Sequence, residues 1–144
     1  MVARIDKFVG EQRFLSNFYP AKVVLDGMEF STVEHAYQAA KATDRKERRF
    51  IQGQPKPGQA KMAGRRIRSL RPDWDAVKVD IMRELLRQKF EDGALRWMLM
   101  QTDDAELVEG NDWGDVFWGE CKGVGSNWLG RLLMQIRSEI GVEV

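Results

Sequence analysis

A long segment after Pro72 and Asp73 carries two apolar stripes at helical spacing, and Gly93 follows it. The stripes are Trp74, Val77, Ile81 and Leu85, and Val79, Met82, Leu86 and Phe90. Two stripes predict one helix buried over a wide face, with Gly93 as its C-terminal stop. A chain of 144 residues built around such a helix is expected to be mainly α.

Ahead of that helix, the Asp26-Gly27 pair separates two short β-prone runs, residues 21–25 and 28–30. Asp-Gly favours positive φ at both central positions of a two-residue turn, so a small β-hairpin is expected here. The next residues have the form of a capping box, with Ser31 as N-cap and Glu34 at the third helical position. A helix over about 32–42 follows from this pattern.

Further helices are predicted from start signals, breaks and periodicity in the rest of the chain. They are expected at 44–52, 59–67, 94–100 and 129–140, with the last stopped at Gly141. Residues 110–126 are rich in Gly, Asp and Trp without helical period. We expect residues 1–144 to form a single, mainly helical domain with a small N-terminal β-hairpin.

The lone Cys121 and the lone His35 limit the chemistry. One cysteine excludes an internal disulfide and a thiolate metal site, and one histidine excludes most catalytic zinc sites. We expect no metal and no cofactor. No apolar run is long enough to span a bilayer, and the N-terminal residues lack the hydrophobic core of a signal peptide. A cytoplasmic protein without a membrane partner is expected.

The formal net charge of +1 conceals a basic segment at residues 41–71. Eleven Lys or Arg stand there against Asp44 and Glu47, a net of +9. Such a run suits a substrate with phosphates, although a solvated helical surface would account for it equally well.

Glu34, Gln38 and Lys41 stand at i, i+4 and i+7, so they project from one face of the same predicted helix. Small neighbours such as Ala39 would let a ligand approach this face closely. The alternative is structural: Glu34 caps the helix start, and Lys41 favours the helix dipole at its end.

A second cluster lies in residues 109–119, where Trp and carboxylate residues alternate on a Gly-rich backbone. This composition suits a sugar-nucleoside site, since an aromatic surface stacks a base and a carboxylate stabilises a cationic sugar. The alternative is that Trp113 or Trp118 belongs to the core, and we expect this of one of them. Residues 14–20 also place Ser16 and Asn17 among aromatics, which indicates a site, although the spacing alone favours a turn in which Asn17 bonds its own backbone.

Together these segments resemble the NADAR (YbiA-like) family. The motifs that carry the resemblance are FLSNFYP, STVEHAYQAAK, AKMAGR, the stretch from Glu109 to Gly119, and GVGSNWLGRLLMQIR. They follow in order from about Arg13 to Arg137. The resemblance implies a mainly helical fold and N-glycosidase activity. It implies as substrates either N-ribosylated pyrimidine phosphates of riboflavin biosynthesis or ADP-ribosyl-guanine in DNA or RNA.

The resemblance also implies which residues form the site. Onto matching positions it places Glu34, Lys41 and Asp115 as catalytic residues, and Asn17 and Asn127 as substrate-binding residues. The further residues expected to bind substrate are Phe18, Gln38, Lys61, Arg65, Trp118 and Gly119. Lys61 and Arg65 would bind phosphate from one helical face, and Phe18 and Trp118 would stack a base.

Breaking a ribosyl C–N bond requires a carboxylate, a proton source and a positioned water. Asp115 and Glu34 would share the carboxylate work, one steering water and the other binding ribose hydroxyls. Lys41 would either protonate the departing group or attack an opened ribose and form a Schiff base, which requires a lowered pKa. The alternative functions are a non-catalytic module that binds ADP-ribose and a structural nucleic-acid protein.

Overall fold

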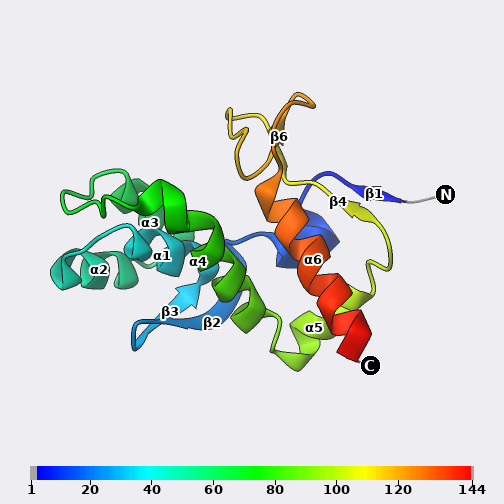
Figure 1. Cartoon of the computed structure of the whole chain (residues 1–144), viewed down its shortest axis with the longest axis horizontal. Helices are drawn as coiled ribbons and strands as arrows, with labels where there is room; N and C mark the ends of the chain where they lie inside the picture. The colour runs from blue at the N-terminus through cyan, green and yellow to red at the C-terminus, as the bar shows by residue number, and fades with distance from the viewer. Residues whose placement is uncertain (1–2, 144) are drawn as a thin grey trace. The chain divides into compact units, whose positions relative to one another are not determined.

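A computed structural model describes residues 3–143. The chain is mainly helical with a few short strands, which confirms the predicted fold class (Figure 1). Its contacts gather into two compact units, Asn17–Lys89 and residues 3–16 with 90–143, and each is described by itself. A single domain over the whole chain stays a prediction.

The unit Asn17–Lys89 begins with the expected hairpin. Strands β2 (Pro20–Leu25) and β3 (Met28–Thr32) are antiparallel, with Leu25 opposite Met28. Asp26 and Gly27 form the turn with φ of 49° and 79°. Positive φ at both positions is the geometry that Asp-Gly favours, so the hairpin prediction is confirmed.

Helix α1 (Val33–Ala40) follows the hairpin directly, and its N-cap differs from the prediction. Thr32, not Ser31, caps the helix by accepting a hydrogen bond from the backbone N–H of His35 at 3.0 Å. Because β3 continues through Thr32, the chain turns into the helix one residue later than the capping-box pattern indicates. Glu34 is therefore the second helical residue and has no role in a capping box.

The side chain of His35 forms hydrogen bonds through both of its ring nitrogens. Its Nδ1 lies 2.7 Å from the Thr32 hydroxyl, and its Nε2 lies 2.8 Å from the backbone oxygen of Gln54. A carbonyl oxygen only accepts, so Nε2 carries a proton and donates it. His35 is fully buried and connects the start of α1 to the segment that follows helix α2 (Arg45–Gln52).

Three more helices complete the unit: α2 (Arg45–Gln52), α3 (Pro57–Gly64) and α4 (Trp74–Lys89). Asp44 caps α2 as predicted, accepting from the backbone N–H of Lys46 at 2.9 Å. Helix α3 ends at Gly64, three residues before the predicted end. The eight residues of α1 are all buried, and α1 packs against all three helices and the hairpin.

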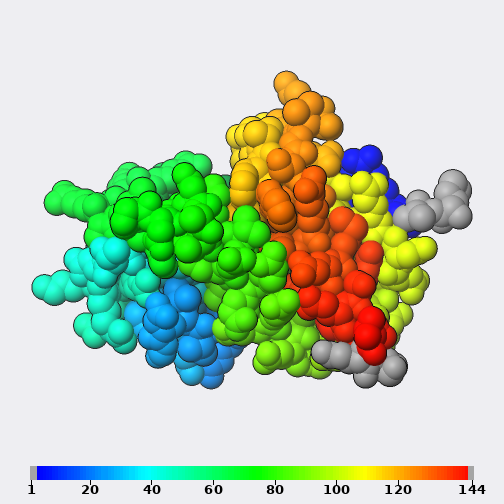
Figure 2. All heavy atoms as spheres, viewed as in Figure 1, coloured from blue at the N-terminus to red at the C-terminus, as the bar shows by residue number. Residues whose placement is uncertain are grey.

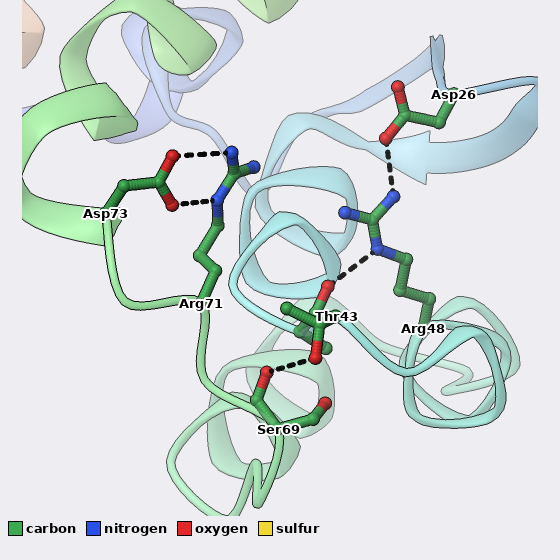
Figure 3. Close-up of polar contacts among 7 residues, drawn as sticks. Asp26, Thr43, Arg48, Ser69, Arg71 and Asp73 are labelled. Atoms are coloured by element: carbon green, nitrogen blue, oxygen red, sulfur yellow. Dashed lines mark hydrogen bonds and ion pairs between the residues drawn. The ribbon is translucent and has the colours of Figure 1, made fainter.

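Two arginines of the basic segment fasten this unit together (Figure 3). Arg48 donates to Asp26 at 2.6 Å and to the Ala42 backbone oxygen at 2.9 Å, while Arg71 pairs with Asp73 at 2.7 Å. The same close-up shows the Thr43 hydroxyl donating to the Ser69 backbone oxygen. These contacts hold the connections before α2 and before α4.

Helix α4 buries Met82, Leu85 and Leu86 from the two predicted stripes. It ends at Lys89, and the predicted stop at Gly93 is wrong. Gly93 is the first residue of α5 (Gly93–Met100), because Asp92 caps that helix by accepting from the backbone N–H of Leu95 at 3.0 Å. A local start signal at Asp92 therefore outweighs the stop signal of the glycine.

Lys89 is only 1% exposed, and its ammonium lies 5.9 Å from the ring centroid of Tyr19. Burial disfavours the charged form and lowers the pKa of Lys89 to about 7. In the unfolded chain Lys89 has an ordinary lysine pKa near 10.4. Between about pH 7 and 10 the unfolded chain therefore still binds a proton that the folded protein has released. Stability should therefore rise with pH from about 7 towards 10, and be lowest where both states are protonated.

Lys89→Met is expected to flatten this rise, because methionine has no charge to desolvate. Urea unfolding in pH steps between about 7 and 9.5 measures the slope. Lys22→Met is the matched control, since the Lys22 side chain is 71% exposed and should leave the slope unchanged. A Lys89→Met slope equal to that of the control would contradict the burial argument.

The other unit contains short parallel pairs and two helices besides the 3₁₀ helix η1 (Gly10–Leu15). Strand β1 (Arg4–Ile5) pairs with β4 (Glu106–Leu107), and β5 (Gly110–Asn111) pairs with β6 (Glu120–Cys121). Helix α6 (Trp128–Glu143) runs through Gly141, so the predicted stop there is wrong. A helical glycine is tolerated at modest cost, and Gly141 has no positive φ.

The apolar stripe predicted for α6 is confirmed. Its buried residues are Leu129, Leu132, Leu133, Ile136 and Ile140. None of the helices in residues 3–143 is both long and apolar enough to cross a membrane.

Candidate active site

The structure brings Glu34, Gln38 and Lys41 together along α1, as their spacing predicts. Glu34 and Gln38 are 8% and 5% exposed, and the Gln38 Nε2 donates to the Glu34 Oε2 at 2.7 Å. Lys41 follows the last helical turn and is half-buried. A buried carboxyl group with one amide partner and a lysine two turns away form the centre of the candidate site.

Burial moves both ionisable groups towards their neutral forms. It raises the pKa of Glu34, opposed by the Gln38 hydrogen bond and the charges of Lys61 and Lys41. It lowers the pKa of Lys41, opposed by the charge of Glu34 and assisted by Arg65 and Lys61. Among the described residues, Lys41 makes no ion pair within 4.0 Å. The site thus contains a carboxyl that retains a proton more readily and an amine that loses one more readily.

Two aromatic rings position the Lys41 ammonium. Its Nζ lies 5.6 Å from the ring centroid of Tyr37 and 5.9 Å from that of Trp74. The two rings are 5.1 Å apart and tilted by 54°. The sequence reasoning missed both residues as site residues: Tyr37 lies one helical turn before Lys41, a usable signal, but Trp74 was assigned only to a core stripe.

Helix α3 supplies cations to the same region. Lys61 affects the pKa of both Glu34 and Lys41, and Arg65 affects that of Lys41. Gly64 of α3 lies directly against α1, because a Cβ added there would overlap the Gln38 side-chain amide. Lys78 of α4 also acts on Lys41, and sequence reasoning missed it.

Asn17 and Gln38 each contain a buried acceptor, and each bonds Glu34 through another of its atoms. The Asn17 backbone oxygen accepts from the Glu34 N–H at 3.1 Å, and its Nδ2 lies 3.5 Å from the Met82 sulfur. The Asn17 side chain therefore does not bond its own backbone, so the turn favoured by its spacing is not formed. Asn17 Oδ1 and Gln38 Oε1 are buried without a hydrogen-bond partner within residues 3–143. Buried acceptors of this kind suit a ligand that supplies hydroxyl or N–H donors.

Phe18 follows Asn17 directly and lines a surface cavity. It is 41% exposed and lines a cavity of about 960 Å³ between α2 and α3, whose lining includes neither Glu34 nor Lys41. The structure does not bring Phe18 together with the α1 residues in this cavity.

Asp115, Trp118 and Gly119 lie in the other unit, within one structured loop. The Asp115 Oδ1 accepts from the backbone N–H groups of Phe117 and Trp118 at 3.1 and 2.9 Å. The Asn111 side chain bonds the Asp115 backbone on both sides, donating to its oxygen and accepting from its N–H. Asp115 Oδ2 has no partner within the described chain, so one carboxylate oxygen orders the loop and the other is available to a ligand.

Aromatic contacts and a close glycine complete this loop. Trp118 is half-buried and meets Phe117 edge to face, with centroids 4.9 Å apart. Gly119 is buried where a Cβ would overlap Glu109 and Asn111. Trp113 is 61% exposed, so the expectation that Trp113 or Trp118 is a core residue is wrong: the irregular loop keeps both outside the buried core.

Asn127 has a clear structural part. It has a positive φ of 52°, and its amide accepts from the Glu109 N–H at 3.0 Å and donates to the Leu107 oxygen at 2.9 Å. These bonds fix the start of α6 against β4. Among the described residues, no group of three or more His, Cys, Asp or Glu side chains could hold a metal ion.

Comparisons with known proteins show the family of the chain. Residues 7–141 match the NADAR domain. The chain is 41% identical over 131 residues to N-glycosidase YbiA of Shigella flexneri, covering 89% of this chain and 81% of that protein. It is 35% identical over 130 residues to a riboflavin biosynthesis protein of Vibrio vulnificus, covering 88% of this chain and 35% of that protein. The solved NMR structure of Escherichia coli YbiA is similar with a TM-score of 0.84 at 39% identity, covering 99% and 88% of the two chains. The chain therefore belongs to the NADAR family and is an N-glycosidase.

Proposed function

We propose that this protein hydrolyses the bond between a ribosyl group and a nitrogen of its aglycone, with Glu34 and Lys41 as the reacting side chains. The observation that carries the proposal is the buried Glu34 of α1 with the half-buried Lys41 after its last turn, in which the pKa of the carboxyl is raised and that of the amine is lowered. This is the protonation pattern that a nucleophilic amine and a neighbouring acid require.

Lys41 acts as the nucleophile. Opening of the ribose ring first converts the glycosidic C–N bond into an imine at C1, and the ring oxygen takes a proton. The neutral Lys41 amine then adds to C1, and the aglycone nitrogen leaves with a proton. Water adds to the resulting Lys41 imine and releases the sugar aldehyde, which restores the amine. The net reaction consumes one water.

Glu34 moves the protons in these steps. Its raised pKa leaves a proton available for the departing nitrogen, and the resulting carboxylate can take one back from the attacking amine or water. Tyr37 and Trp74 hold the Lys41 amine in place, since its Nζ lies within 5.9 Å of both ring centroids. The buried Oδ1 of Asn17 accepts a hydrogen bond from a ribose hydroxyl, and Gln38 contributes to the site through its hydrogen bond to Glu34.

Lys61 and Arg65 bind the substrate phosphate from α3, which the effect of both charges on Lys41 supports. Asp115 is proposed as a further catalytic residue that accepts a ribose hydroxyl through Oδ2, supported by the absence of a partner for that oxygen in the described chain. Trp118 and Phe18 are proposed to stack on bases, and Gly119 is proposed to contact the substrate. Asn127 is proposed to act indirectly, because its side chain accepts from the Glu109 N–H and so positions that loop.

The substrates we propose are ADP-ribosyl-guanine in a nucleotide, DNA or RNA, and N-ribosylated pyrimidine phosphates. The second is supported by the name of the Vibrio vulnificus relative, a riboflavin biosynthesis protein. Both substrates contain a ribosyl C–N bond, which Lys41 would attack, and at least one phosphate, which Lys61 and Arg65 would bind. The cytoplasm is the proposed compartment, since a lone Cys121 suits a reducing environment.

Borohydride reduction during turnover tests this mechanism. With an active substrate, the imine should be trapped as a stable ribosyl adduct, and peptide mass spectrometry should locate it at Lys41. Lys41→Met should give no adduct and no base release, whereas Lys22→Met, at an exposed position, should behave as wild type. Base release without any adduct would overturn the imine route. Binding of both substrates without base release would indicate a module that binds ADP-ribose.

A further inference from the structure

Seven of the eleven cations of residues 41–71 fall into three groups in the structure. Arg48 and Arg71 form ion pairs that hold connections of the fold (Figure 3). Lys61 and Arg65 act on Lys41. A third group lines the cavity between α2 and α3 and has no part in the proposed reaction; its members are Lys46, Lys56 and Arg66.

This cavity, here called the α2–α3 groove, combines the third group of cations with exposed apolar side chains. Its lining includes Phe18, Phe50, Met62 and the three cations, and its volume is about 960 Å³. Phe50 is 65% exposed and Met62 is 51% exposed. Exposed apolar side chains that gather in one groove mark an interaction site. The segment from α2 to α3 reaches the surface in the space-filling view, coloured cyan to green (Figure 2).

The groove is electropositive because three cations line it against one carboxylate, Glu47. Glu47 accepts from the backbone N–H groups of Arg68 and Ser69 at 2.9 Å and from the Ser69 hydroxyl at 2.5 Å. These bonds lower the pKa of Glu47 and turn its charge towards the connection after α3. Within residues 3–143, none of Lys46, Lys56 and Arg66 forms an ion pair.

We propose that the α2–α3 groove binds a single strand of nucleic acid that continues from the ribosylated nucleotide, with a base on Phe50 and phosphates on the three cations. Exposed aromatic rings among unpaired cations are the combination that single strands require, because each base has a π face and each linkage one negative charge. A helical protein partner would instead need a continuous apolar surface, which the cations interrupt. This inference deepens the proposed function and rests on it for the reacting nucleotide.

Anisotropy of a fluorescein-labelled oligothymidylate of about twelve nucleotides measures this site without any cleavage. Wild type should bind with affinity that falls between about 50 and 200 mM salt, with a logarithmic slope of about −2 for three phosphate contacts. Phe50→Ala should weaken binding about tenfold, the loss expected for one stacked base. The variant K46Q/K56Q/R66Q should bring the slope close to zero.

Matched controls use exposed residues outside the groove. Trp97→Ala removes an aromatic ring that is 64% exposed on α5, and K7Q/K22Q/K122Q removes three exposed cations. Both should bind the oligonucleotide as wild type does, and circular dichroism should show that all variants are folded. Equal affinity and slope for the groove and control variants would overturn the inference, as would tight binding of an acidic amphipathic peptide with no binding of the oligonucleotide.

The failure of one proposal is distinguishable from that of the other. Anisotropy uses an unmodified strand, so it tests the groove alone, while base release by Glu34→Gln tests only the chemistry. Strand binding by wild type with full activity of Glu34→Gln would leave the groove standing and overturn the proposed mechanism. Loss of activity in Glu34→Gln, with no strand binding by wild type, would overturn the groove inference and leave the proposed mechanism standing.

Discussion

Glu34→Gln should lower kcat by about 10²- to 10⁴-fold, the range expected for loss of a positioned acid–base group. Glutamine keeps the size and hydrogen-bonding capacity of a protonated glutamate, and the raised pKa of Glu34 favours that protonated form in the folded protein. Thr32, not Glu34, caps α1, so the substitution leaves the helix start intact. Loss of rate should therefore occur without loss of stability.

The pH dependence of kcat gives a second measurement of Glu34. In the wild type, activity requires protonated Glu34 and neutral Lys41. Loss of the Glu34 proton should lower kcat at high pH, because the pKa of Glu34 is raised but still limits its protonated form. Protonation of Lys41 should lower kcat at low pH, below the lowered pKa of that amine. Glu34→Gln should lose the alkaline limb only. Glu84→Gln, at an exposed position of α4, is the matched control and should keep both limbs and the full rate. A Glu34→Gln enzyme as active as this control would remove Glu34 from the mechanism.

Gly64→Ala should destabilise the protein by about 1–3 kcal/mol, the usual cost of an added methyl group in a filled interior. The new Cβ would overlap the Gln38 side-chain amide and approach its Cβ to 3.1 Å. Gln38 cannot easily move away, since it is buried and donates to Glu34. Gly64 has no positive φ, so the whole effect comes from space and not from backbone strain.

Gly58→Ala is the matched control on the same helix, because a Cβ there meets nothing within 4 Å. Its stability should change by no more than about 0.5 kcal/mol. Urea unfolding compares the two variants, and Gln38→Ala combined with Gly64→Ala should recover part of the lost stability because the clash is gone. Equal stability of the two glycine variants would show that α1 and α3 can separate at little cost. Gly64→Ala should also lower kcat, since Gln38 would be moved from Glu34.

Local patterns predicted the hairpin, the helix that contains Glu34 and Lys41, and the start of α2 at Asp44. Each is determined by residues within one or two turns: a turn type, a cap, or a face. The errors arose where another local or long-range interaction decided the outcome. Ser31 has the pattern of a cap, but pairing of β3 through Thr32 moves the helix start by one residue. Gly93 and Gly141 have the pattern of stops, but Asp92 starts a helix at the first and α6 continues through the second.

The candidate site was predictable only along α1. Lys41 meets Trp74 because α1 packs against α4, a contact between residues 33 positions apart that no local period contains. The same holds for the division of the basic segment: sequence shows eleven cations, but only packing separates those that act on Lys41 from those in the α2–α3 groove. Burial of Glu34 likewise follows from three helices and a hairpin closing around α1.

The bonds of His35 give the chain's one imidazole a structural task. The ring is buried and bonded on both nitrogens, to the Thr32 hydroxyl and to the Gln54 backbone. One side chain of α1 therefore joins the end of β3 to the segment after α2, so the helix that contains Glu34 is held in place by a residue that has no part in the proposed reaction.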